Sequence, residues 1–523
     1  MLGDLDCSSL SDVTAAYERV AKIVVAPTIA PPKASDRAQP ADRCGRRGVA
    51  SVMATACGDS LGIRHRGPST AHSSIVERLH SGRGLRIYAV GGSVTANFAG
   101  CFGAGCHVPQ HERAGDGYFS TSKNMMARGF LHSFMRELNA TYPSSHHAVY
   151  NRGMSGHDCK PVASCVQSFV PQGAADLVLI DFSVNRCGAE KIQHIVAQLQ
   201  LYRPPPVVVV AQNFWWCWGA EGTRSACSNA SMALPGEVEA KRLQAASMVG
   251  DQLEIESFAA SCGAVVLSAY YELLPRVERG ELAPRQIAAG GVHPNTPLPG
   301  EPLIDAWIGL LRRWIGAAST SWRGAGAADC ELAACPSRVV QQLEVSRSLR
   351  LCYGGGYPWL PALHAVRSSG FKFKRAAENA PGSYKPGWVS THEGDTIDFG
   401  TGTAATGHNI SVDVLALHSY ANVSAACFGC RGTCSCASRW HNLTWRRRDS
   451  LTTVAVTLRV VSDASDGCLI SVSNQPTENT CESNSFEASA PTTALGLADR
   501  PVAQQVKIDG LIVRQPVASR RRR

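Results

Sequence analysis

The chain has 523 residues, 44% of them hydrophobic and 18% charged, which is enough for two or three folded domains and excludes a disordered protein. The formal net charge is +9, but most of the excess lies in the first ninety residues and in the tail at 520–523. The middle of the chain therefore lacks the concentrated basic surface of a nucleic-acid groove. We expect no nucleic-acid partner, and we interpret the four-arginine tail as a solvated end.

Cysteine usage and glycosylation sequons point to the secretory pathway. The chain has 20 cysteines and five Asn-x-Ser/Thr sequons, at Asn139, Asn229, Asn409, Asn422 and Asn442. Both features are typical of an oxidising, glycosylating compartment, so we predict a secreted or lumenal glycoprotein. No stretch approaches the ~20 apolar residues of a membrane span. The first residues lack the tripartite pattern of a signal peptide, which an incomplete or misassigned start would explain.

Residues 1–80 mix Pro, Ser, Arg and Gly without sustained periodicity, which predicts a poorly ordered leader. From 81 to 325, short apolar runs alternate with helical patterns. The expected strands, apolar at nearly every position, are 86–92, 148–153, 176–183, 207–214 and 264–270. Helices are expected at 122–141, at 190–201 and around Leu303, Ile304, Trp307, Leu310, Leu311 and Trp314. This alternation predicts a parallel sheet between two layers of helices.

Residues 326–519 carry β signals instead of helical ones. Short strands are expected at 371–376, 409–420, 452–461, 468–474 and 506–515, separated by turn residues. In the strand at 452–461, Val454, Val456, Leu458 and Val460 alternate with polar or small residues, as one buried sheet face requires. We predict an all-β sandwich as an accessory domain.

Four features follow the expected strands of the first domain, where the reacting groups of an open parallel sheet collect. Ser93 follows the pair Gly91-Gly92, and Gly156 lies in the loop after the second strand. Asn185 ends the third strand's loop, and His293 lies between the last strand and the closing helix. Each has a plain alternative: a strand-ending turn for the glycine loops, a helix cap for the asparagine and a structural role for the histidine.

The order and spacing of these four features resemble the SGNH hydrolases, also called GDSL esterases, over residues 85 to 316. The resemblance implies a three-layer, flavodoxin-like α/β/α fold with Ser93 as nucleophile and His293 as general base. It also implies an oxyanion hole made by the backbone N–H groups of Ser93 and Gly156 and by the side chain of Asn185. The family's usual Asp-Gly-Ser reads Gly91-Gly92-Ser93 here.

One departure from the family concerns the acid that orients the histidine. The family has an aspartate three residues before its histidine, and Gly290 stands at that position here. Three explanations remain open: another carboxylate substitutes, Ser93 and His293 act as a dyad, or the domain is catalytically weak or inactive. Glu281 and Asp305 are two candidate acids, each 12 residues from His293 in sequence.

Two clusters outside these loops have more than one interpretation. Trp215, Trp216 and Trp218 follow the fourth strand and either bind substrate, such as a sugar ring or an acyl chain, or pack in the core. The cysteines at 427, 430, 434 and 436 do not have the spacing of a zinc knuckle, so we expect disulfides there. We expect no metal and no cofactor.

The leading hypothesis is a secreted serine esterase that removes acyl groups, such as acetyl, from a glycan, with lipid esters as the competing substrate. Two other classes of function remain: an O-acyltransferase that uses the same Ser93 and His293, and an inactive binding protein that retains the fold. For the accessory domain, carbohydrate binding and structural support are equally favoured.

Overall fold

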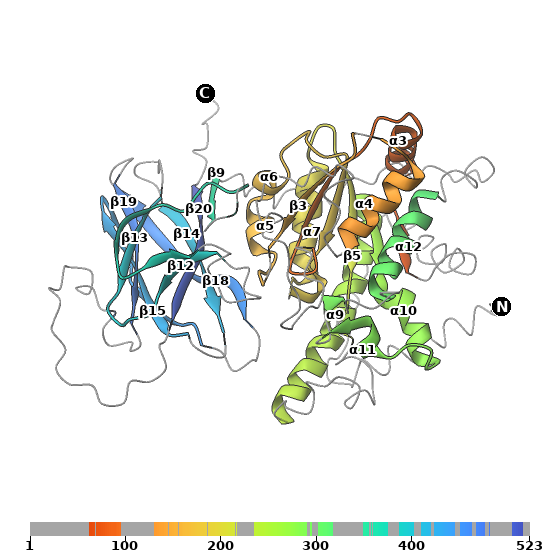
Figure 1. The fold of residues 1–523 in the computed structure, drawn as a ribbon. Coiled ribbons are helices and arrows are strands. Elements are labelled where there is room, and N and C mark those ends of the chain that lie inside the picture. Colours follow the sequence, from red (N-terminus) through yellow and green to blue (C-terminus); the bar gives the residue numbers. More distant parts are fainter. Residues whose placement is uncertain are drawn as a thin grey trace, which may run out of the picture.

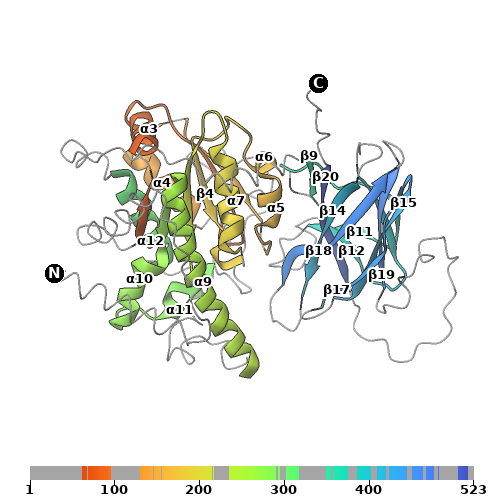
Figure 2. The ribbon, with the colours of Figure 1, turned by 180° about the vertical axis from the view of Figure 1, so that it is seen from behind.

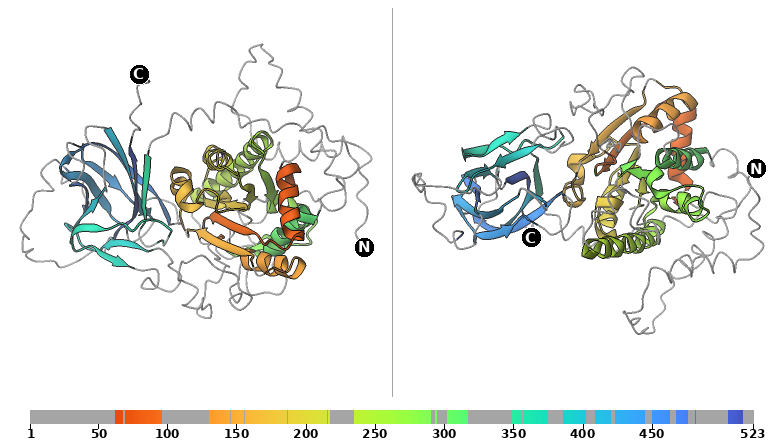
Figure 3. Two further views of the ribbon diagram at one scale, coloured as in Figure 1. Left: turned by 90° about the horizontal axis from the view of Figure 1, so that it is seen from above. Right: turned by 60° about the horizontal axis from the view of Figure 1, so that its bottom comes forward.

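The computed structural model describes two β-containing domains that lie side by side (Figures 1 and 3). It describes residues 62–67, 69–95, 130–144, 146–154, 156–185, 187–214, 216, 235–289, 293–294, 302–316, 349–354, 357, 359–374, 386–401, 409–419, 423–444, 450–462, 467–475, 481 and 505–515. No helix among them is long and apolar enough to cross a membrane.

The first domain is built on a six-stranded sheet in the order β1-β6-β5-β4-β2-β3. Five strands are parallel, and β1 pairs antiparallel with β6 at one edge. In chain order the parallel strands are arranged 2-1-3-4-5, the flavodoxin-like order expected from the sequence. The strands are β1 (Ile63–Arg66), β2 (Arg86–Gly91), β3 (Ala148–Gly153), β4 (Leu177–Asp181), β5 (Val207–Gln212) and β6 (Val265–Ser268).

Helices cover both faces of this sheet (Figures 1 and 2). Alternate residues of β2 enter different hydrophobic clusters: Ile87 and Ala89 face one, Tyr88 and Val90 the other. The first cluster includes side chains of α3 (Ser69–His80), α4 (Phe130–Thr141), α10 (Ala269–Glu278) and α12 (Pro302–Gly316). The second includes side chains of α5 (Lys160–Ser164), α6 (Val166–Phe169), α7 (Ala189–Gln200) and α9 (Pro235–Cys262). The predicted three-layer arrangement is confirmed.

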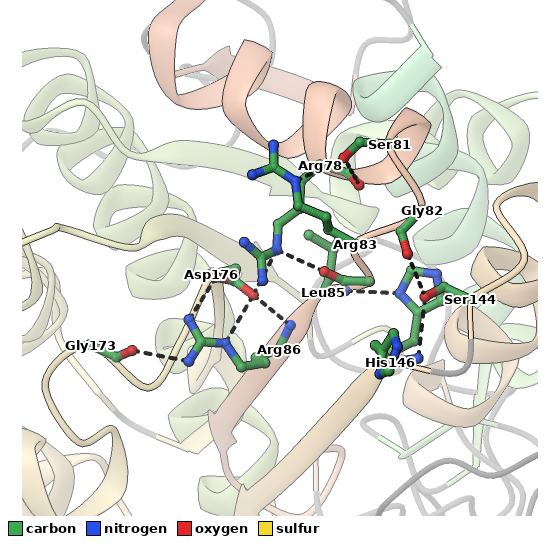
Figure 4. Close-up of polar contacts among 12 residues, drawn as sticks. Arg78, Ser81, Gly82, Arg83, Leu85, Arg86, Ser144, His146, Gly173 and Asp176 are labelled. Atoms are coloured by element: carbon green, nitrogen blue, oxygen red, sulfur yellow. Dashed lines mark hydrogen bonds and ion pairs between the residues drawn. The ribbon is translucent and has the colours of Figure 1, made fainter.

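The folded domain begins earlier than predicted, because residues 62–80 are not part of a disordered leader. β1 extends the sheet, and the side chains of Ile75 and Leu79 in α3 are buried in the core. Arg78 of α3 and Arg86 of β2 both form ion pairs with Asp176, which directly precedes β4 (Figure 4). These contacts fasten α3 to the amino end of the sheet. Residues 1–61 and 122–129, the latter part of a predicted helix, lie outside the described residues.

The second domain is a β-sandwich, as predicted. One sheet has the order β10-β13-β19-β15-β17, and the other has the order β11-β12-β20-β14-β18-β16, with β9 paired to β20. Both enclose one hydrophobic core. The strands are β9 (Leu349–Gly354), β10 (Ala365–Ser369), β11 (Lys372–Lys374), β12 (Gly387–Ser390), β13 (Thr396–Gly400), β14 (Asn409–His418), β15 (Ala425–Gly432), β16 (Cys434–Ser435), β17 (Arg439–Asn442), β18 (Leu451–Ser462), β19 (Cys468–Asn474) and β20 (Val506–Gln515).

The cysteines at 427, 430, 434 and 436 all form disulfides, which confirms the interpretation against a zinc site. The bonds are Cys427–Cys481, Cys430–Cys436 and Cys434–Cys468. They tie β15 and β16 to neighbouring segments of the sandwich.

One of the four residues predicted to form the buried face of β18 points elsewhere. Val456, Leu458 and Val460 enter the sandwich core, but Val454 packs against the second hydrophobic cluster of the first domain. The cause is a bulge: the register of β14 and β18 shifts at Ala455, and the bulge reverses the facing of the residues before it.

The two domains share a core and a covalent link. Cys352, Tyr357, Leu360, Leu415 and Ile512 of the second domain belong to the same hydrophobic cluster as α5, α6 and α7 of the first. A disulfide joins Cys165, between α5 and α6, to Cys352 in β9. A shared apolar interface of this kind opposes the independent domain motion expected of linked domains.

Candidate active site

The loop after β2 carries Ser93 at the carboxyl edge of the sheet. The Gly92 N–H donates to the carbonyl of Asp181 at the end of β4, at 3.1 Å, and the Met154 N–H donates to the carbonyl of Gly91, at 2.8 Å. Ser93 is 9% exposed. Because β2 lies between β3 and β4, three loops meet at this serine. This is the point where the strand order reverses, which is where ligands of open α/β sheets bind.

Glycine is required at both positions before Ser93, because atoms of neighbouring residues lie where a side chain would be. A side chain at position 91 would overlap the hydroxyl of Thr95 and the carbonyl of Asp181. A side chain at position 92 would overlap the amide of Asn185. The Gly91-Gly92-Ser93 variant therefore has a physical reason, because the aspartate usual in SGNH hydrolases does not fit at position 91 of this loop.

Asn185 lies beside the Ser93 loop, and the oxygen of its side-chain amide accepts no hydrogen bond from the described residues. It ends the 3-10 turn η2 (Ser183–Asn185) after β4, and its side chain lies over Gly92. Asn185 is 7% exposed, and its Oδ1 has no hydrogen-bond partner in the described part of the chain. Buried amide groups are normally hydrogen-bonded, so the Oδ1 atom of Asn185 is an acceptor available to a group that donates.

Gly156 is in the left-handed region, with φ +68°, in the loop after β3. Glycine adopts this conformation without steric cost, whereas other residues rarely do. A disulfide between Cys159 and Cys187 connects this loop to the one that carries Asn185. The loops of the three predicted oxyanion-hole residues are thus joined to one another by hydrogen bonds and by a covalent bond.

The backbone of His293 lies in β8 (His293–Pro294), which pairs with β7 (Ala288–Ala289) and contacts α12. Its side chain and Gly290 lie outside what the structure describes, so the pairing of His293 with Ser93 stays a prediction. Of the two candidate acids, Glu281 pairs with Arg279 at the surface and Asp305 is exposed on α12. Neither carboxylate faces the interior.

Trp216 is buried at 2% exposure, against Phe214 and Tyr270. This packing leaves little of its ring for a ligand, which favours the core-packing alternative for this residue. Trp215 and Trp218 lie outside the described residues. Within the described ranges, no cluster of three His, Cys, Asp or Glu side chains is arranged to hold a metal ion.

Asp181 is a site-adjacent residue that the sequence analysis missed, because it reads as the end of an apolar strand. The Thr95 hydroxyl donates to its Oδ2 at 3.2 Å, and its Oδ1 has no partner among the described residues. Burial away from water raises the pKa of this carboxyl group to about 7. A second polar group without a full set of partners thus lies under the Ser93 loop.

Asp181→Asn is expected to remove a pH-dependent loss of stability. An acid whose folded pKa is raised stabilises the fold below its unfolded pKa, near 4, and loses that contribution as the pH rises through its folded pKa of about 7. Between pH 5 and pH 8 the loss amounts to roughly 3 kcal/mol in the wild type. Urea unfolding at pH 5 and pH 8 measures it. The variant should lose less stability between these pH values than the wild type, and equal losses would contradict the assignment.

Comparison with known proteins rests on structure, since no family model and no curated protein matches the sequence. A two-domain esterase active on acetylated mannans is similar over 88% of this chain and 98% of its own, at 15% identity and a TM-score of 0.51. The structure of that esterase co-crystallised with mannopentaose gives a TM-score of 0.50. An acetyl xylan esterase from Geobacillus stearothermophilus, 14% identical, aligns with 45% of this chain and 95% of its own at a TM-score of 0.32.

The likeness to the two-domain esterase extends over both domains of this chain. The chain therefore has the two-domain architecture expected from its resemblance to SGNH hydrolases, an α/β/α domain of that fold followed by a β-sandwich.

Proposed function

We propose that this protein is a serine esterase that removes acyl groups, above all acetyl, from a glycan. The observation that carries the proposal is the position of Ser93 beside the side-chain amide of Asn185 at the switch point of the sheet. A serine hydroxyl next to a side-chain amide, whose Nδ2 group can donate a hydrogen bond, is the arrangement that acyl transfer requires. Gly156, in a loop covalently joined to that of Asn185, supplies a further backbone N–H.

In the proposed reaction, the Ser93 oxygen attacks the ester carbonyl while His293 accepts the hydroxyl proton. The negative charge that develops on the carbonyl oxygen is stabilised by the N–H groups of Ser93 and Gly156 and by Asn185. His293 then gives its proton to the leaving sugar oxygen, and the acyl group stays on Ser93. Water, deprotonated by His293, releases the acid and restores the serine. The proposed mechanism uses Ser93 and His293 as a dyad, since Glu281 and Asp305 are both exposed.

The substrate class rests on three observations. The two-domain esterase of similar fold is active on acetylated mannans. The disulfides of both domains and the five sequons favour a protein that functions outside the cytosol, where polysaccharides occur. The sandwich is packed directly against the α/β domain, so a polymer that reaches Ser93 also passes near the second domain.

Acetate release from acetylated mannan and acetylated xylan, by the whole chain and by the Ser93→Ala variant, tests the proposal. We expect the wild type to release acetate and the variant to release none above background. Glycerol added as acceptor separates hydrolysis from transfer, since acetylglycerol in excess of free acetate would assign an acyltransferase. If the protein cleaved emulsified lipid esters but neither acetylated glycan, the proposal of a glycan substrate would be overturned. Absence of both turnover and fluorophosphonate labelling of Ser93 would overturn the esterase.

A further inference from the structure

The loop that carries Gly156 is bound to the second domain. The Thr452 N–H of β18 donates to the Gly156 carbonyl at 2.6 Å, and the Asp158 N–H donates to the Thr452 carbonyl at 3.3 Å. These bonds form a parallel bridge between the loop and the strand. The Thr453 hydroxyl donates to the Asp158 carboxylate at 2.8 Å. Three hydrogen bonds thus cross the domain boundary within three residues of the loop.

The side chain of His157, between Gly156 and Asp158, is inserted into the same boundary. It is 1% exposed, and its Nε2 lies 3.6 Å from a carboxylate oxygen of Asp509 in β20. Its Nδ1 lies 3.4 Å from the Tyr357 hydroxyl. The Asp509 carboxylate also accepts a 2.5 Å bond from the Thr452 hydroxyl. The other oxygen of this carboxylate, Oδ1, accepts no hydrogen bond from the described residues and lies 3.5 Å from the Lys507 ammonium nitrogen.

The bulge in β18 orients the sandwich for this contact. Ala455 and Val456 both enter the sandwich core, and the residues before them turn toward the first domain. Val454 packs against, and Leu415 belongs to, the hydrophobic cluster that also contains side chains of α5 and α6. Bulges re-aim side chains next to active sites, and this one directs the start of β18 to the loop.

We propose that the β-sandwich holds the oxyanion-hole loop in its working position, with Thr453 and Asp509 as positioning residues; this rests on the proposed function. Thr452 holds the peptide plane that carries the Gly156 carbonyl, and the φ of +68° orients the neighbouring plane that carries the Gly156 N–H. In the described part of the chain that N–H has no hydrogen-bond partner. A donor fixed before the substrate arrives stabilises the transition state without reorganisation.

Thr453→Val tests the proposal, because valine keeps the shape of the side chain and removes only the hydroxyl. The matched control is Thr457→Val on the same strand, where the Thr457 hydroxyl donates to Asp413 within the sandwich at 2.6 Å. With 4-nitrophenyl acetate, we expect Thr453→Val to lower kcat ~10-fold and to change KM by no more than about twofold. The effect is smaller than that of removing an oxyanion-hole donor, because the Gly156 N–H is misplaced and not lost. Thr457→Val should match the wild type, and Thr453→Ser should restore most of kcat.

Hydrogen exchange of peptides that cover residues 154–160 provides a measurement independent of turnover. Exchange should accelerate in Thr453→Val and remain unchanged in Thr457→Val. If the wild type is active and the two valine variants have equal kcat, or if exchange in the loop does not change, the positioning role is overturned and the esterase proposal stands. If the wild type hydrolyses no ester, the esterase proposal itself has failed, and the positioning role fails with it.

Discussion

Replacing Ser93 with alanine is expected to lower kcat for acetyl-ester hydrolysis by at least about 10⁴-fold, with KM changed only a few-fold. The substitution removes the attacking oxygen but leaves the backbone N–H of residue 93, so binding and part of the oxyanion hole remain. The residue is buried at a strand end held by its neighbours' backbone bonds, and a smaller side chain leaves those bonds intact. Steady-state kinetics with 4-nitrophenyl acetate measures the effect.

Ser81→Ala is the matched control for this substitution. Ser81 lies at the opposite, amino end of the sheet, where its hydroxyl donates to the Arg78 carbonyl at 3.0 Å (Figure 4). It should retain wild-type kcat. A fluorophosphonate should add its mass to the wild-type peptide that contains Ser93 and leave the same peptide of Ser93→Ala unmodified. Turnover in Ser93→Ala within tenfold of the wild type would exclude this serine as the nucleophile.

The interior of the fold was predictable because burial leaves a pattern in the sequence. The strand at 207–212 reads Val-Val-Val-Val-Ala-Gln and is buried throughout, and such a run indicates a central parallel strand without further information. β1 was missed because it reads Ile-Arg-His-Arg and none of its side chains is fully buried. Its place comes from backbone hydrogen bonds to β6, which leave no periodicity in the side chains.

The site was predictable only where each residue follows a strand end. Ser93 and Asn185 satisfy this rule, and the resemblance supplied their roles. Asp181 was overlooked because nothing in sequence shows that a carboxyl group at a strand end is enclosed by the neighbouring loop. The contact of Thr453 with Asp158 joins residues 295 positions apart, and no local pattern encodes it. Interactions between domains depend on how the surfaces of the two folded domains pack together, which only the tertiary structure determines.

Asn185→Ala is expected to lower kcat by about 10²–10³-fold while leaving the stability of the fold nearly unchanged. The catalytic loss follows from removing a donor directed at the developing negative charge. The small stability effect follows from the unsatisfied Oδ1: no described residue hydrogen-bonds to it, so alanine breaks no bond there and removes a buried polar group that has no partner. Steady-state kinetics and urea unfolding of the same samples measure the two effects.

Two variants separate this explanation from general damage to the site. Gly92→Ala keeps the asparagine at position 185 but puts a methyl group where its amide lies. The amide is then displaced, so kcat should fall by a similar factor. Asn474→Ala removes an asparagine of the second domain whose amide donates to the Ser390 hydroxyl at 3.0 Å. There a satisfied buried bond is lost, so stability should fall by about 1–3 kcal/mol while kcat stays at the wild-type value. If Asn185→Ala instead lost stability and kept its kcat, the asparagine would be a structural cap, and the oxyanion hole would consist of backbone donors alone.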